Sequence, residues 1–233
     1  MSEVRDRAML LRRIAYGESS LVVHMLTAGH GRIALMAKGA RRAKSPFRAT
    51  LAPLHELDVA WRPGRTGMGT LTGAERGEPL LPEHLMYDGL ELSALASGIF
   101  QEGEPQGFEE LRMACRLLAE RAGTTGLLAA AWYLLDQGGW VGSLGHCWHC
   151  GREAEPLYWS KGYLHCADCD RGAEVSRGAC RGILGHMRSP RVYLPEHDVR
   201  TWRTMVQDVL RLHGLRILSS LASQNNSANR RDA

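Results

Sequence analysis

The chain has 233 residues, of which 44% are hydrophobic and 23% are charged, as in a globular protein that buries one large core or two smaller ones. Its longest apolar run, residues 127–135, is much shorter than the roughly 20 residues that span a bilayer. Charged residues interrupt the apolar run near the N-terminus, so we expect neither a membrane span nor a signal peptide.

Charge is divided unevenly along the chain. Residues 1–65 hold twelve Lys and Arg against five Asp and Glu, a net charge of +7, whereas the remainder holds seventeen against twenty, a net charge of −3. A basic N-terminal module suits a polyanion, and a slightly acidic remainder suits protein partners.

The first eighty residues contain short apolar runs separated by turn residues, which predict β-strands. Large apolar side chains alternate within residues 57–61, and Gly29-His30-Gly31 predicts a hairpin turn. The five predicted strands span residues 9–14, 21–26, 32–36, 57–61 and 69–72. Five strands fit a small closed barrel, so we expect an OB-fold nucleic-acid-binding domain over residues 1–80.

Beyond Pro79 and Pro82 the apolar residues recur at helical spacing. The predicted helices span residues 85–100, 108–122, 125–137, 175–187 and 196–221. The fold class is therefore α+β, with a helical domain over residues 81–223 after the barrel. Residues 224–233 lack large apolar side chains, and we expect a disordered tail there.

Four cysteines form two pairs, Cys147-x-x-Cys150 and Cys166-x-x-Cys169, with fifteen residues between the pairs. Two such knuckles can place four thiolates around one zinc ion. This predicts a zinc ribbon at about residues 145–172, inserted in the helical domain, with a hairpin that turns at Lys161-Gly162. A site with four protein ligands leaves no open position for catalysis, so the zinc is expected to be structural.

Other uses of these cysteines are disulfides, which need an oxidising compartment, or a redox pair. The neighbouring His146, His149 and His165 are alternative ligands, although a complete thiolate set favours their lying outside the coordination sphere. Cys115 and Cys180 stand alone in apolar helical patterns, as small core residues do.

A basic loop follows the third predicted strand. Five cations lie within eleven residues: Lys38, Arg41, Arg42, Lys44 and Arg48. They can neutralise successive phosphates on a barrel surface that suits single-stranded nucleic acid. Further candidate DNA contacts in the same module are Arg12, Arg13 and Arg32. The alternative is a solvated loop whose charges only aid solubility.

Aromatic side chains for base stacking are few in this module: Tyr16, Phe47 and Trp61, of which Trp61 is expected in the core. Binding should therefore depend on phosphates and on salt concentration. No His-x-Glu motif of a zinc deaminase and no Gly-x-x-x-x-Gly-Lys-Ser/Thr loop occurs in the sequence, so an enzyme is not expected.

Three N-terminal motifs are distinctive: Tyr16-Gly17-Glu18-Ser19-Ser20-Leu21, Thr27-Ala28-Gly29-His30-Gly31-Arg32, and the basic loop through Lys44-Ser45-Pro46. Together they resemble the barrel of the RecO family of bacterial recombination mediators. The order of barrel, helices and four-cysteine ribbon agrees as well. Residues 212–220 depart from the Leu-Gly-Arg-Pro-Leu-Lys-Ser pattern expected near the end, which leaves the role of the last helix open.

The resemblance implies a cytoplasmic, nucleoid-associated protein without enzymatic activity. Such proteins bind single- and double-stranded DNA, anneal complementary strands, and cooperate with RecR to load RecA onto DNA coated by single-strand-binding protein. They also bind the acidic C-terminal tail of that coating protein, for which Arg112, Arg116 and Arg121 are candidates here. The alternative is a zinc-ribbon factor that binds RNA or bridges proteins.

Overall fold

The structure is a computed structural model that describes residues 2–64, 67–121 and 123–222. The tail predicted over residues 224–233 lies outside the described residues. The chain forms two compact units, Met1–Arg116 and Leu117–Ala233, with the division inside a helix. Within the described ranges, no helix has the length and apolar character that a bilayer crossing requires.

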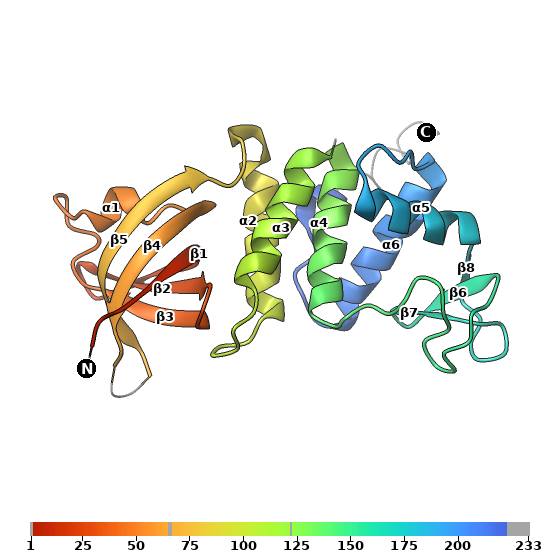
Figure 1. Ribbon diagram of the computed structural model, residues 1–233, viewed down its shortest axis with the longest axis horizontal. Coiled ribbons are helices and arrows are strands. Elements are labelled where there is room, and N and C mark those ends of the chain that lie inside the picture. The colour runs from red at the N-terminus through yellow and green to blue at the C-terminus, as the bar shows by residue number, and fades with distance from the viewer. Residues whose placement is uncertain (1, 65–66, 122, 223–233) are drawn as a thin grey trace, which may run out of the picture. The chain divides into compact units, whose positions relative to one another are not determined.

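The N-terminal unit is built on a closed five-stranded barrel (Figure 1). Its strands are β1 (Val4–Tyr16), β2 (Ser20–Thr27), β3 (Gly31–Ala37), β4 (His55–Arg62) and β5 (Gly69–Pro79), in the closed order β1-β2-β3-β5-β4. Neighbouring strands are antiparallel except for the parallel pair β3 and β5. The predicted five-stranded OB-fold barrel is confirmed.

Side-chain alternation explains the barrel core. In β4 the buried Leu57, Val59 and Trp61 point into the barrel, as expected for a strand with one face on a core. In β1 three consecutive residues are buried: Ala8 and Leu10 belong to the barrel core, whereas Met9 between them does not. The outer face of β1 is covered because α2 (Met86–Ile99) packs against it.

Three further helical segments belong to or begin in this unit. A short helix, α1 (Phe47–Thr50), closes the basic loop, and a 3₁₀ turn, η1 (Glu83–Leu85), precedes α2. The next helix is α3 (Phe108–Glu120). Gly107, just before it, lies so close to Leu26 and Phe100 that a Cβ would be 2.7 and 2.9 Å from their side chains. The sequence did not predict α1, because four residues carry no periodic signal.

The C-terminal unit combines helices with a small sheet. Its helices are α4 (Gly123–Gln137), α5 (Arg177–Arg188), α6 (Glu196–Leu212) and α7 (Ser219–Ala222). The first three pack on one another, and Trp202 of α6 is fully buried. The sheet has the order β7-β6-β8, from β6 (Leu157–Ser160), β7 (Tyr163–His165) and β8 (Ala173–Val175).

One predicted helix limit in this unit is wrong, and another differs by two residues. The helix predicted over residues 196–221 ends at Leu212, because Gly214 adopts a φ of 65° and the Leu215 N–H donates to the Leu210 carbonyl at 2.8 Å. The helix predicted from residue 175 begins at Arg177, where the Ser176 hydroxyl caps it by accepting from the Ala179 N–H. The residues just before it form β8 instead.

Candidate nucleic-acid interface and metal centre

The basic loop between β3 and α1 is held on the turn between β1 and β2. The Arg41 N–H donates to the Ser19 carbonyl at 2.8 Å, and the Arg41 guanidinium donates to the Gly17 carbonyl at 3.0 Å. The Gly39 N–H donates to the Ser20 hydroxyl at 3.3 Å. Two motifs that are separate in sequence therefore form one surface.

The chain direction within the loop depends on Gly39 and Ala40. Gly39 has a φ of 66°, a conformation that glycine adopts at little cost. Ala40 is buried in the barrel core. With Ala40 held inside, the cations on both sides of it are directed outward.

All five predicted loop cations are exposed: Lys38, Arg41, Arg42, Lys44 and Arg48. Within the part of the chain that the structure describes, none of them forms an ion pair. No carboxylate of the described residues therefore compensates their charge. A surface of this kind attracts phosphates, whose bound counterions are released on contact.

A shallow hollow beside the loop has a volume of about 340 Å³. It is lined by Arg13, Leu21, Ala40, Arg41, Phe47 and Arg48. The structure thus brings together three of the predicted DNA contacts around the half-buried ring of Phe47. Arg13 is also fixed in place, because its guanidinium donates to the Leu51 carbonyl at 3.0 Å.

Two neighbouring residues add to this surface. Tyr16 is 59% exposed and directly precedes Gly17, whose carbonyl binds Arg41. Arg76 of β5 is exposed and donates to the Ala49 carbonyl of α1 at 3.1 Å. No local sequence pattern points to Arg76, because its place beside the loop depends on the packing of α1 against β5. Trp61, by contrast, is buried in the core as predicted.

Two predicted contacts outside the loop, Arg12 and Arg32, lie apart from the hollow. Arg12 is exposed on β1, but adjacent strand residues point to opposite faces, so it does not join Arg13. Arg32 donates to the Ser97 carbonyl at the end of α2 and lies 3.8 Å from the Glu102 carboxylate. Its guanidinium therefore holds structural contacts.

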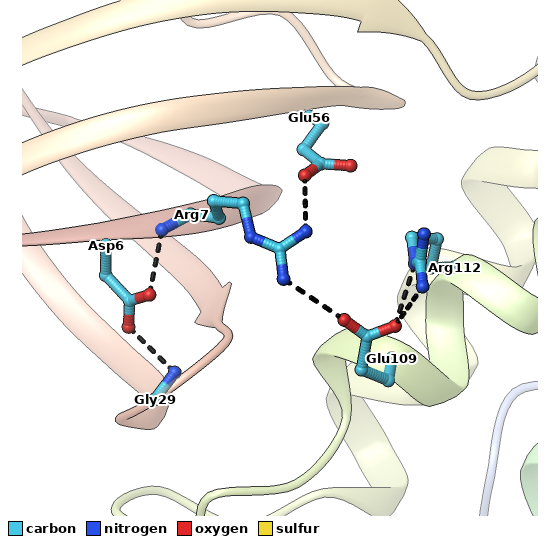
Figure 2. A network of polar contacts seen from close by, with 6 residues as sticks. All are labelled: Asp6, Arg7, Gly29, Glu56, Glu109 and Arg112. Atoms are coloured by element: carbon cyan, nitrogen blue, oxygen red, sulfur yellow. Dashed lines mark hydrogen bonds and ion pairs between the residues drawn. The ribbon is translucent and has the colours of Figure 1, made fainter.

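Arg7 shows the same internal use of a cation (Figure 2). Its guanidinium lies 2.9 Å from Glu56 of β4 and 3.3 Å from Glu109 of α3, and it covers the Phe108 ring at 5.0 Å. Hydrogen bonds to these carboxylates, Glu56 first, raise the pKa of Arg7 above its usual value. Glu109 also pairs with Arg112, one of the candidates for the acidic tail.

Arg121, another candidate for that tail, is not at the surface. Its side chain is only 2% exposed and donates to the carbonyls of His186 and Met187 at the end of α5. These carbonyls lie at the negative end of a helix dipole, where a cation is stabilised. Burial lowers the pKa of Arg121.

The four cysteines of the predicted ribbon converge on one point. Their sulfur atoms all lie within 4.8 Å of one another, and the Cys150 and Cys166 sulfurs are 3.8 Å apart. A tetrahedral site with metal–sulfur bonds of about 2.3 Å has sulfur–sulfur distances of about 3.8 Å. The cluster can thus hold one metal ion, and His146, His149 and His165 are not part of it among the described residues.

The knuckles form because their turns are closed by backbone hydrogen bonds. The Gly151 N–H donates to the Cys147 carbonyl at 2.9 Å, and the Cys169 N–H donates to the Cys166 carbonyl at 3.0 Å. Between them, Lys161 and Gly162 have φ values of 51° and 86° in the two-residue turn joining β6 and β7. The predicted hairpin is confirmed.

The thiols of the cluster differ in how readily they ionise. Burial, the largest single influence, raises the pKa of Cys147, but the N–H groups of Cys150, Cys166 and His149 donate to its sulfur and together lower that pKa to about 5. The pKa of Cys169 is raised to about 12, mainly through its hydrogen bond with Cys166. A metal ion would displace the protons that such crowded sulfurs retain.

The barrel and a large part of the whole chain are similar to known proteins. The family described as "Recombination protein O N terminal" matches residues 1–79, the barrel. A protein of Bifidobacterium longum named "DNA repair protein RecO" is 32% identical over 170 residues, which cover 69% of this chain and 70% of that protein. Proteins of the same name match shorter segments. The one from Glaesserella parasuis is 40% identical over 100 residues, which cover 43% of this chain and 38% of that protein. The one from Salinibacter ruber is 39% identical over 111 residues, which cover 45% of this chain and 42% of that protein. The chain therefore belongs to the RecO family.

Proposed function

We propose that this protein is a non-enzymatic mediator of DNA repair and homologous recombination. In this role it binds single- and double-stranded DNA and anneals complementary strands. It also helps to load RecA onto DNA coated by single-strand-binding protein, in cooperation with RecR, at the nucleoid. The related proteins carry the name "DNA repair protein", and the barrel supplies a DNA-binding surface.

The observation that carries the proposal is the basic loop. Its five exposed cations have no ion-pair partner among the described residues, and the loop is anchored to the β1–β2 turn. We assign phosphate contact to this loop, with Arg13 and Arg76 beside it. Tyr16 is placed to stack on a base. The proposed DNA-binding domain is residues 1–80, and the helical residues 81–223 are left for protein partners.

We propose that the metal is a single structural zinc ion bound by Cys147, Cys150, Cys166 and Cys169. Four thiolates suit zinc and leave no open coordination position. When bound, the ion cross-links the two knuckles. An exposed ion pair between Arg152 and Asp168, at 3.1 Å, joins the same knuckles.

Strand annealing tests the proposal. Purified protein is mixed with complementary fluorescent DNA oligonucleotides, with and without bound single-strand-binding protein, over a salt series. The proposal predicts annealing that persists on coated strands and weakens as salt rises. Folded, metal-loaded protein that does not anneal DNA, but binds structured RNA tightly, would instead favour an RNA-binding factor.

A further inference from the structure

A second basic surface lies on the C-terminal unit, in residues that the proposed function leaves unused. Residues 177–195 contain four arginines and no acidic residue, although the sequence beyond residue 65 is acidic overall. We define the α5 surface as Arg181, Leu184, Arg188, Arg191 and Tyr193. It comprises one side of α5 and the loop that follows.

The helical part of the α5 surface is a continuous row. Arg181, Leu184 and Arg188 are three and four residues apart, so they lie on one side of α5. All three are exposed. Arg177, one turn earlier, pairs with Glu155 at 2.7 Å and Glu153 at 3.5 Å. Within the described ranges no such carboxylate pairs with the other two arginines or with Arg191.

The loop after α5 is fixed against the helix. A Cβ on Gly182 would lie 2.9 Å from Leu194, and one on Gly185 would lie 3.2 Å from Val192, so both loop residues pack onto the two glycines. The Val192 carbonyl also lies 2.9 Å from Nδ1 of the buried His186. These contacts hold the loop along the helix.

Packing of Val192 and Leu194 determines the direction of the residue between them. Neighbouring side chains of an extended segment point to opposite sides, and Tyr193 is 82% exposed. Arg121 stabilises the base of this arrangement, since it binds the last carbonyls of α5. An aromatic ring thus projects from a firmly held loop, two residues from Arg191.

We propose that the α5 surface is a second binding site for single-stranded nucleic acid. Arg181, Arg188 and Arg191 would neutralise phosphates, and Tyr193 would stack on a base. Unpaired arginines beside an exposed aromatic ring are the elements of such a site. The two carboxylates that share a hollow with Arg181, Glu153 and Glu155, are both paired with Arg177. The inference goes beyond the proposed function, which assigns DNA to the barrel, and would allow one chain to hold two strands.

Binding of a fluorescent oligo(dT) to the full chain tests the site. We expect the triple variant Arg181→Ala/Arg188→Ala/Arg191→Ala to reduce the magnitude of the salt slope of the affinity by about 2, because each lost phosphate contact lowers it by roughly 0.7. Tyr193→Ala should weaken binding on the order of tenfold, and Tyr193→Phe should restore it because stacking needs only the ring. Ultraviolet cross-linking should attach the oligonucleotide at Tyr193.

Matched controls separate this site from general effects. Lys161→Ala/Arg171→Ala/Arg216→Ala removes three cations elsewhere in the same unit, and Tyr87→Ala removes another exposed tyrosine. Both should bind oligo(dT) as the wild type does. The variant Arg41→Ala/Arg42→Ala tests DNA binding by the barrel alone. Its oligo(dT) affinity therefore distinguishes a failure of the proposed barrel site from a failure of the α5 surface.

Unchanged affinity and salt slope in the α5 variants, with no cross-link at Tyr193, would overturn the inference. It would equally be wrong if these variants bound oligo(dT) normally but lost binding to DNA-free single-strand-binding protein. In that case the occupant of the α5 surface would be an acidic protein.

Discussion

The basic loop of the barrel and the cysteine ribbon are both rich in polar groups, but they use them in opposite ways. In the ribbon, Arg152 pairs with Asp168 and Lys161 pairs with Asp170 at 3.0 Å, and four thiols face one another. In the loop, none of the five cations has a carboxylate partner among the described residues. Groups that satisfy one another maintain a structure, whereas uncompensated charge of one sign is available to a ligand.

The largest effect is expected in the ribbon. Cys147→Ser should abolish metal binding and lower the free energy of unfolding by several kcal/mol, because binding of a structural zinc ion contributes directly to folding. Metal content by mass spectrometry and denaturant unfolding measure both effects. Cys180→Ser, outside the cluster, should retain one metal ion per chain. Unchanged stability of the Cys147→Ser variant would contradict a structural role for the metal site.

In the loop, substitution should affect binding and leave folding unchanged. Arg41→Ala/Arg42→Ala should weaken single-stranded DNA binding roughly tenfold and reduce the salt slope by about 1.4. The melting temperature should stay close to that of the wild type, since surface substitutions change stability by about 0.5 kcal/mol or less. Fluorescence anisotropy provides the affinity. Lys161→Ala/Arg171→Ala is the charge-matched control, and an equal loss in it would contradict the comparison.

Arg7 lies in the barrel but, like the cations of the ribbon, is paired with carboxylates. Arg7→Met removes two exposed ion pairs and a contact with the Phe108 ring, and should cost about 1 kcal/mol of stability. DNA affinity should be unchanged. Thermal unfolding and anisotropy test the pair of effects, with Arg5→Met on the same strand as a control. A loss of DNA binding without a loss of stability would show that Arg7 belongs to the interface.

The smallest effect concerns the conformation of the loop. Gly39→Ala places a side chain at a φ of 66° and should cost about 1 kcal/mol. DNA affinity should fall only a few-fold, because the cations remain but their directions change. Gly73→Ala is the control, since a Cβ there meets Ala60 at an ordinary 3.7 Å. If Gly39→Ala bound DNA as tightly as the control, loop geometry would not matter.

Local patterns predicted much of this structure. The alternation in β4, the turn at Lys161-Gly162 and the spacing of the cysteine pairs depend on neighbours in sequence, and each was predicted correctly. The paired state of Arg7 and Arg32 could not be predicted, since their partners Glu109 and Glu102 are remote from them in sequence. Burial of Arg121 is also set by a distant helix.

Arg76 and the α5 surface also depend on contacts between residues that are remote in sequence. Arg76 joins the basic loop through a hydrogen bond to the Ala49 carbonyl of α1. Tyr193 projects outward because its two neighbours pack onto two glycines of α5. Charge counts along the sequence locate clusters of cations. Only the fold determines which of them have acidic partners.

The most direct test of the central claim is the salt dependence of oligo(dT) affinity for the wild type and for Lys38→Ala/Arg41→Ala/Arg42→Ala/Lys44→Ala. Because this variant lacks four cations that would each neutralise a phosphate, the slope of the logarithm of affinity against the logarithm of salt concentration should decrease in magnitude by about 3. Thermal stability should be preserved. An unchanged slope in a folded variant would contradict the claim that the unpaired cations of the basic loop bind DNA.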